Sequence, residues 1–100
     1  MHLTLTGIDP GIVDTGVVTL ELNAPERTWS ITHTVFSAPM QRNGFEVSVK
    51  PEVLDGVSRW CTIGRNHLIG IEGYRQRGLN QRQDAEMLEL VRALRETVPS

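Results

Sequence analysis

The sequence predicts a single small domain, residues 1–100, of the α/β class, with a mixed sheet that carries two helices in the order β-β-β-α-β-α. Three patterns support this fold class. Apolar and polar side chains alternate along most of the first 36 residues, which indicates strands. Apolar residues then recur at helical spacing after Pro51 and again after Asp84. Between these two segments lies a short apolar run, typical of a buried strand that follows a crossover helix.

The first three strands are expected to form an antiparallel meander. In residues 2–9 one face consists of Leu3, Leu5, Gly7 and Asp9, and the apolar residues of this segment indicate a buried strand. Residues 15–22 are rich in β-branched side chains, and the short stretch DPGIVD before them is typical of a hairpin, in which Asp14 and Thr15 serve as turn residues. Residues 28–36 alternate again after a turn that contains a proline.

The second half of the sequence alternates between helices and a strand. We expect a loop over 37–49 with a short strand at 45–49, a helix that begins at Pro51 and ends near Gly64, and a buried strand over 67–72. From Asp84 onward a second amphipathic helix is expected. Its apolar stripe consists of Met87, Leu90, Val91, Leu94 and Val98.

Composition and charge exclude several classes of protein. The net charge of −2 argues against a nonspecific coat for nucleic acid, and no apolar run approaches the roughly 20 residues of a membrane span. The chain shows no signal-peptide pattern and its single cysteine, Cys61, fits a packed thiol, so we expect a cytoplasmic protein with no membrane partner. Five arginines lie between Arg59 and Gln83, which suits either a phosphate ligand or a solvated basic face.

Two carboxylates end two of the predicted strands in the same way. Asp9 ends the first strand and Glu72 ends the fourth, and each has a glycine two residues before it on the same strand face. If these strands are neighbours, both acids point into one crevice, where like charges raise a pKa unless a cation lies between them. Mg²⁺ commonly uses one or two carboxylates of this kind. Taken singly, Asp9 before Pro10 is typical of a turn, but the pair on equivalent strand ends favours a metal site.

Two stretches resemble the RuvC-type Holliday junction resolvases of the RNase H-like nuclease superfamily. GIDPGIVDTG, residues 7–16, is similar to the family's first-strand signature, in which Gly-Ile-Asp-Pro-Gly is followed three residues later by Thr-Gly. LIGIE, residues 68–72, resembles the second signature, an apolar strand that ends in the catalytic glutamate. The resemblance implies an RNase H-like fold and a metal-dependent endonuclease that cuts branched DNA in recombination and repair. Asp9 and Glu72 would be its catalytic and metal-binding residues, with two Mg²⁺ or Mn²⁺ ions about 4 Å apart.

The resemblance also implies partners. Phosphate would pass beside the segment that follows Glu72, and the residues expected to bind nucleic acid there are Arg75, Arg77, Asn80, Gln81, Arg82 and Gln83. A four-way junction has two symmetric strands to cut, so a homodimer is implied, with the helices as its contact.

The sequence departs from the family at its end. RuvC-like enzymes carry further acidic residues on a C-terminal helix after a fifth strand, and nothing around Asp84, Glu86 or Glu89 matches that motif. We therefore expect an RNase H-like domain that is truncated before the fifth strand and that helix. Two alternatives stay open: an RNase H-like module that binds nucleic acid or protein without cutting, and a fragment of an ATPase of the actin and sugar-kinase type, which begins with a related strand and Asp-x-Gly hairpin.

Overall fold

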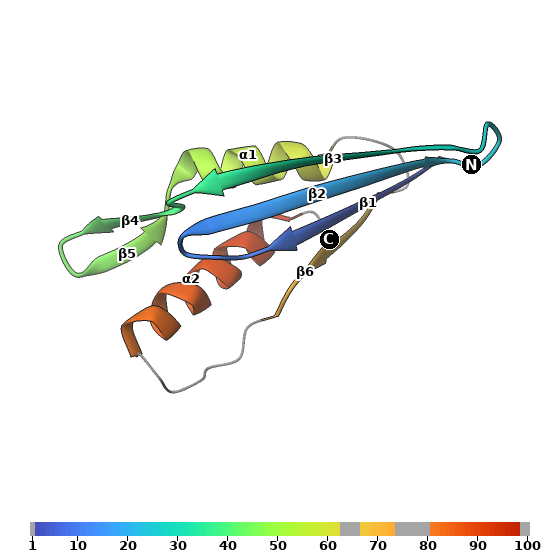
Figure 1. The fold of residues 1–100 in the computed structure, drawn as a ribbon. Helices are drawn as coiled ribbons and strands as arrows, with labels where there is room; N and C mark the ends of the chain where they lie inside the picture. The colour runs from blue at the N-terminus through green and yellow to red at the C-terminus, as the bar shows by residue number, and fades with distance from the viewer. Residues whose placement is uncertain (1, 63–66, 74–80, 99–100) are drawn as a thin grey trace.

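The structure is a computed structural model and describes residues 2–62, 67–73 and 81–98, with the side chains of 81–83 left out of the description. Its elements in order are β1 (His2–Asp9), β2 (Asp14–Asn23), β3 (Thr28–Ser37), β4 (Met40–Asn43), β5 (Glu46–Val49), α1 (Pro51–Thr62), β6 (His67–Ile71) and α2 (Gln81–Thr97). The chain is a small mixed α+β domain with a mixed sheet and two helices, as the sequence predicts at this level (Figure 1).

The main sheet has the strand order β3-β2-β1-β6. Antiparallel pairing joins β1 to β2 and β2 to β3, which confirms the expected meander. β6 pairs with the other edge of β1 in parallel, with Gly7 opposite Gly70 and Ile8 opposite Ile71. The crossover through α1 therefore returns the chain to lie beside its first strand, and the carboxyl ends of β1 and β6 meet at the same end of the sheet.

Residues 37–49 correct the sequence prediction of a loop with one short strand. Residues 40–49 form a separate hairpin, in which β4 and β5 pair around a two-residue turn at Gly44 and Phe45. Gly44 has a φ of 65°, the left-handed conformation that a tight hairpin turn requires and that glycine adopts without strain. Gly44 at the first position of the turn was the available signal for it.

Both helices cover the same face of the main sheet. α1 and α2 both contribute side chains to one core with Ile8 of β1 and Val17 of β2, so the core lies between the two helices and this face of the strands. The buried hydrophobic core consists of Ile8, Val17, Val49, Val53, Val57, Cys61, Leu90, Ala93 and Leu94. The strands also contribute buried threonines to this face, and the Thr6 hydroxyl lies 3.0 Å from that of Thr19 and 2.5 Å from the imidazole of His67.

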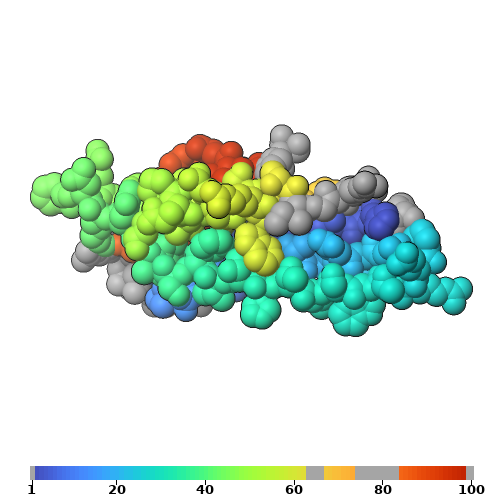
Figure 2. Space-filling view, turned by 90° about the horizontal axis from the view of Figure 1, so that it is seen from above, coloured from blue at the N-terminus to red at the C-terminus, as the bar shows by residue number. Residues whose placement is uncertain are grey.

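The opposite face of the sheet has no helix over it in the described part of the chain. Figure 2 shows the helices along one side of the molecule and the strands along the other. The prediction that the whole apolar run of β1 is buried is therefore only partly correct, because Ile8 faces the core whereas Leu3 and Leu5 lie half-buried on the uncovered face. We call this surface, which also carries Asp9, the open face.

The helices follow the sequence pattern closely. α1 begins at Pro51 as expected, and the end predicted at Gly64 lies outside the described residues. α2 begins three residues before the predicted start at Asp84, and its stripe is buried at Leu90 and Leu94. Cys61 is buried, and desolvation raises the pKa of its thiol, which fits a packed rather than a reactive side chain. No helix in the described part of the chain is long and apolar enough to cross a membrane.

Candidate functional site

The turn after β1 shows why the GIDPGIVDTG motif has its glycine and threonine. A Cβ on Gly11 would lie 2.3 Å from the carbonyl oxygen of Asp14, so the turn closes tightly only with glycine there. The Thr15 hydroxyl accepts a hydrogen bond from the Gly11 amide at 3.3 Å and donates one to the Gly11 carbonyl at 3.0 Å. Asp14 and Thr15 thus belong to the hairpin, and the chain turns away sharply behind Asp9.

Asp9 and Glu72 end neighbouring parallel strands, as the sequence predicts. Gly7 pairs with Gly70 and Ile8 with Ile71. Asp9 and Glu72 each come one residue later, so they lie side by side at the ends of the two strands. The amide of Glu72 donates a hydrogen bond to the carbonyl of Ile8 at 3.0 Å, so the pairing continues to Glu72 itself. Both acids are exposed, and both lie on the open face because side chains two residues apart on a strand share a face.

The two carboxyl groups lie at adjacent strand ends, and Asp9 affects the protonation of Glu72. The pKa of the Glu72 carboxyl is raised above its ordinary value, first by a side-chain hydrogen bond with Asp9, then by the negative charge of Asp9 and by slight desolvation. A carboxyl–carboxyl hydrogen bond needs one proton, and once both groups are ionised their negative charges repel. In the described part of the chain neither acid forms an ion pair with lysine, arginine or histidine. The pair therefore holds closely spaced negative charge that a cation would neutralise.

A hollow of about 580 Å³ opens beside the acid pair on the open face. It is lined by Gly7, Ile8, Asp9, Gly16, Val18, Gly70, Ile71 and Glu72. Three glycines from three adjacent strands form its floor, and a Cβ at any of them would meet nothing within 4 Å. The sequence indicated two of these glycines through their spacing from the acids. Gly16 was missed as a floor residue, because only the β1–β2 register places it opposite Asp9.

The described residues do not bring a third ligand to the acids. Within these ranges there is no group of three or more histidine, cysteine, aspartate or glutamate side chains that could hold a metal ion. Asp84 is buried on α2, which packs against the other face of the sheet. Of the residues predicted to bind nucleic acid, Arg75, Arg77 and Asn80 lie outside the described residues, as do the side chains of Gln81, Arg82 and Gln83.

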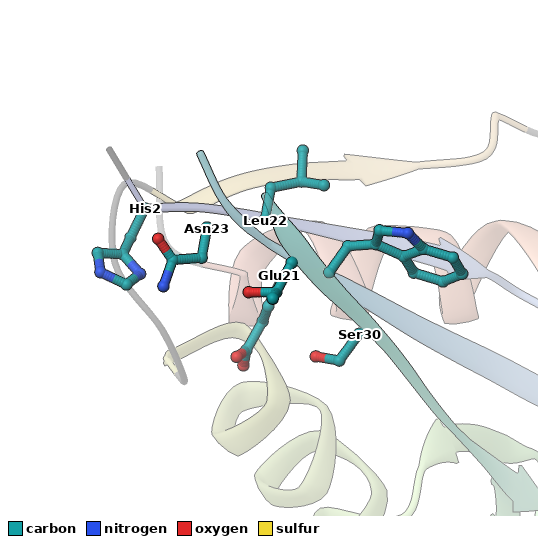
Figure 3. Close-up of a pocket in the computed structure, with 7 residues that line it drawn as sticks. His2, Glu21, Leu22, Asn23 and Ser30 are labelled. Carbon is teal, nitrogen blue, oxygen red and sulfur yellow. The ribbon is translucent and has the colours of Figure 1, made fainter. Parts of the chain in front are cut away.

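A second hollow, of about 310 Å³, lies at the opposite end of the sheet and was not indicated by the sequence (Figure 3). It is lined by His2, Glu21, Leu22, Asn23, Thr28, Trp29 and Ser30. Figure 3 shows that Glu21 and Ser30 point to the side of α1 whereas Leu22 points to the other side. Asn23 Oδ1 is buried there without a hydrogen-bond partner among the described residues. Because that oxygen is out of reach of solvent, we assign it no ligand.

Comparison with known proteins returns no match: no protein-family model, no curated protein and no solved structure is similar to the chain.

Proposed function

We propose that the chain is the metal-binding part of a divalent-metal-dependent endonuclease that acts on branched DNA. One observation carries this proposal: Asp9 and Glu72 end adjacent parallel strands on an uncovered face, where the neighbouring Asp9 raises the pKa of Glu72. The likeness of GIDPGIVDTG and LIGIE to the RuvC-type signatures supports the same function.

The donor set fits Mg²⁺ or Mn²⁺. Both are hard ions that prefer carboxylate oxygens, and both tolerate an open site in which water and substrate phosphate complete the coordination. Asp9 and Glu72 would hold the ion. The pKa of Glu72 is raised first by a side-chain hydrogen bond with Asp9 and then by the charge of Asp9, and the ion would offset that charge. When bound, the metal would supply an activated water and charge stabilisation for a phosphodiester.

The surroundings of the acids suit a large, flexible substrate. The hollow beside them is open and its floor is bare backbone, so a sugar–phosphate chain can approach without meeting side chains from Gly7, Gly16 or Gly70. We propose that the arginines of 75–82 contact DNA phosphates next to this hollow, because the segment follows Glu72 directly. A homodimer would provide the two sites that a symmetric junction needs.

The test combines metal binding with cleavage. Two carboxylates are expected to bind Mn²⁺ weakly, with a dissociation constant on the order of 1 mM, in isothermal titration calorimetry. Asp9→Asn and Glu72→Gln should each weaken binding at least tenfold. Asp55→Asn and Glu52→Gln are matched controls, because both acids are exposed on α1, on the other side of the sheet, and these variants should bind as the wild type does.

The same proteins are then incubated with a labelled four-way junction. We expect slow cleavage that requires Mg²⁺ or Mn²⁺ and vanishes in Asp9→Asn. Metal and junction binding without cleavage would favour a module that binds nucleic acid without cutting it. Metal binding unchanged in both Asp9→Asn and Glu72→Gln, or cleavage that survives Asp9→Asn, would refute the proposed site.

A further inference from the structure

The hollow beside the acid pair is a step in the open face, bounded by bulky apolar groups. Three leucines lie directly opposite one another across β2, β1 and β6: Leu20, Leu5 and Leu68. Two positions further along β1 and β6, toward the acids, the same face carries only Gly7 and Gly70. Their neighbour in that row on β2 is the exposed Val18. The hollow thus has a floor of backbone between a row of leucines and the acid pair.

This floor is flat and offers few groups for hydrogen bonding. The backbone of a strand lies close to the plane of its sheet, and no Cβ rises from Gly7, Gly16 or Gly70. β1 and β2 are each paired on both sides, so the sheet takes up the amides and carbonyls of Gly7 and Gly16. A sugar or phosphate group resting here would give up hydrogen bonds to water and gain none, which costs free energy. A flat ring with apolar faces can rest here and keep its polar edge in solvent.

The acid pair lies one step away from this floor. Asp9 is two residues beyond Gly7 on the same strand face, about 7 Å along β1, and Glu72 has the same relation to Gly70. Within one nucleotide the base and the phosphate are separated by a similar distance. A phosphate held at Asp9 and Glu72 would therefore leave its base over Gly7 and Gly70.

We propose that the hollow is a subsite for one unpaired nucleobase, which lies face-down on the glycine floor while its own phosphate is held at the acid pair. The inference rests on the proposed function, because the acids hold the phosphate through a metal ion. The subsite contacts the face of the base and not its edge, so it accepts every base. It binds a purine more tightly than a pyrimidine, because a purine buries more apolar surface.

The subsite also explains a preference for branched DNA. A base in an intact duplex is paired and stacked between its neighbours, and it must leave the stack before its face can reach the floor. That step costs free energy, and it costs least where bases are already unpaired, as at a branch point or a bulge. The protein should therefore favour DNA that carries unstacked nucleotides beside the phosphate at the acid pair.

NMR with small probes tests the subsite directly. Deoxyadenosine has a base but no phosphate, whereas deoxyribose 5-phosphate has a phosphate but no base. In EDTA, deoxyadenosine should move the Hα resonances of Gly7, Gly16 and Gly70 upfield, because protons that face an aromatic ring are shielded. Deoxyribose 5-phosphate should leave them unchanged, and thymidine should give smaller shifts than deoxyadenosine at the same concentration.

Gly70→Val and Gly7→Val test whether the base occupies the hollow. Each adds a side chain where the structure has space, so the fold tolerates it, and each removes the place of the base. The deoxyadenosine shifts at the remaining floor glycines should be lost in both variants. Ser30→Val is the matched control, because Ser30 is exposed on β3 and points to the side of α1 (Figure 3), and this variant should respond as the wild type does. Circular dichroism verifies the fold of each variant.

Unmoved glycine resonances in the wild type would overturn the subsite. Shifts that persist or grow in both valine variants would also overturn it, because they would indicate an adhesive apolar face without a fitted hollow. A duplex with one unpaired adenine should bind more tightly than the same duplex with an abasic nucleotide at that position. Equal affinities for the two duplexes would overturn the preference for an unpaired base.

Mg²⁺ separates this inference from the proposed function. With Mg²⁺, deoxyadenosine 5′-monophosphate should bind more tightly than deoxyadenosine, and Asp9→Asn, which keeps the glycine floor, should lose this gain. Glycine shifts with deoxyadenosine but no gain from Mg²⁺ would support the base subsite and refute the metal-held phosphate. A gain from Mg²⁺ without shifts at the glycines would support the metal site and overturn the base subsite.

Discussion

The backbone amide of Glu72 donates a hydrogen bond to the carbonyl oxygen of Ile8 at 3.0 Å, and this bond fixes the end of β6 beside the end of β1. With its backbone fixed, the Glu72 side chain can move away from Asp9 only by rotation about its own side-chain bonds. The fold thus holds two like charges together at the edge of the sheet. Groups that are held in this way at a cost to stability are typical of functional sites.

Glu72→Gln should stabilise the fold at neutral pH. The folded-state pKa of Glu72 is raised, so its contribution to stability is fully present below the ordinary carboxyl pKa and is lost as pH rises through the raised value. At pH 7 the wild type therefore carries the repulsion from Asp9, which the neutral amide removes. Thermal unfolding from pH 3 to 8 should show a higher melting temperature for the variant at neutral pH and a difference that shrinks toward pH 3. Glu52→Gln, on α1, should show no such change with pH. A variant that is less stable at pH 7 would contradict the repulsion.

Removing two of the predicted DNA contacts should weaken junction binding and reduce its salt dependence. Each phosphate contact contributes roughly one unit to the slope of log affinity against log salt concentration, so Arg75→Ala combined with Arg77→Ala should lower that slope by about 2. Fluorescence anisotropy with a labelled junction at several salt concentrations measures both quantities. Arg92→Ala is the control, because Arg92 pairs with Glu89 and Glu96 on the surface of α2. If affinity and slope do not change in the double variant, the basic segment is merely solvated.

Gly56→Ala should destabilise the protein although alanine is the better helix former. A Cβ at Gly56 would lie 2.5 Å from Cε1 and 2.7 Å from Cζ of Phe36, so either the Phe36 ring or α1 must shift. Overpacking of this kind costs about 1–3 kcal/mol, which exceeds the gain in helix propensity of about 1 kcal/mol. Urea denaturation should show a lower free energy of unfolding for Gly56→Ala than for the wild type. Asp55→Ala, at an exposed position of the same helix, should stay within about 0.5 kcal/mol of the wild type. If Gly56→Ala is more stable than the wild type, the Phe36 ring shifts without a loss of stability and the predicted overpacking is wrong.

Local patterns were enough to predict most of the elements. Alternation located β1, β2 and β3, and helical spacing located α1 and α2, because each of these elements presents one apolar stripe or face. The hairpin of β4 and β5 was mostly missed, since its strands have four residues each and little alternation. The glycine at the first position of its Gly44-Phe45 turn was the better signal.

The choice of buried face could not be predicted from the strands alone. Leu3 and Leu5 are more apolar than Thr4 and Thr6, yet the threonines are buried, because the helices pack on their side of the sheet. That choice depends on contacts between segments far apart in the sequence. For the candidate site, the matched strand ends predicted that Asp9 and Glu72 would meet. The hollow beside them depends on two registers at once, β1 with β2 and β1 with β6, which no local pattern contains.

The carboxyl pKa of Glu72 tests most directly whether the two acids form a shared cation site. NMR of the side-chain carboxyl carbon can follow its titration in the wild type and in Asp9→Asn, with and without Mg²⁺. Without metal, the pKa should be raised in the wild type and return to the ordinary glutamate value in Asp9→Asn. With saturating Mg²⁺, the wild-type pKa should fall below that of the metal-free protein, because bound cation favours the ionised carboxylate. A Glu72 that titrates at the ordinary glutamate value in the wild type and does not respond to Mg²⁺ would contradict the shared site.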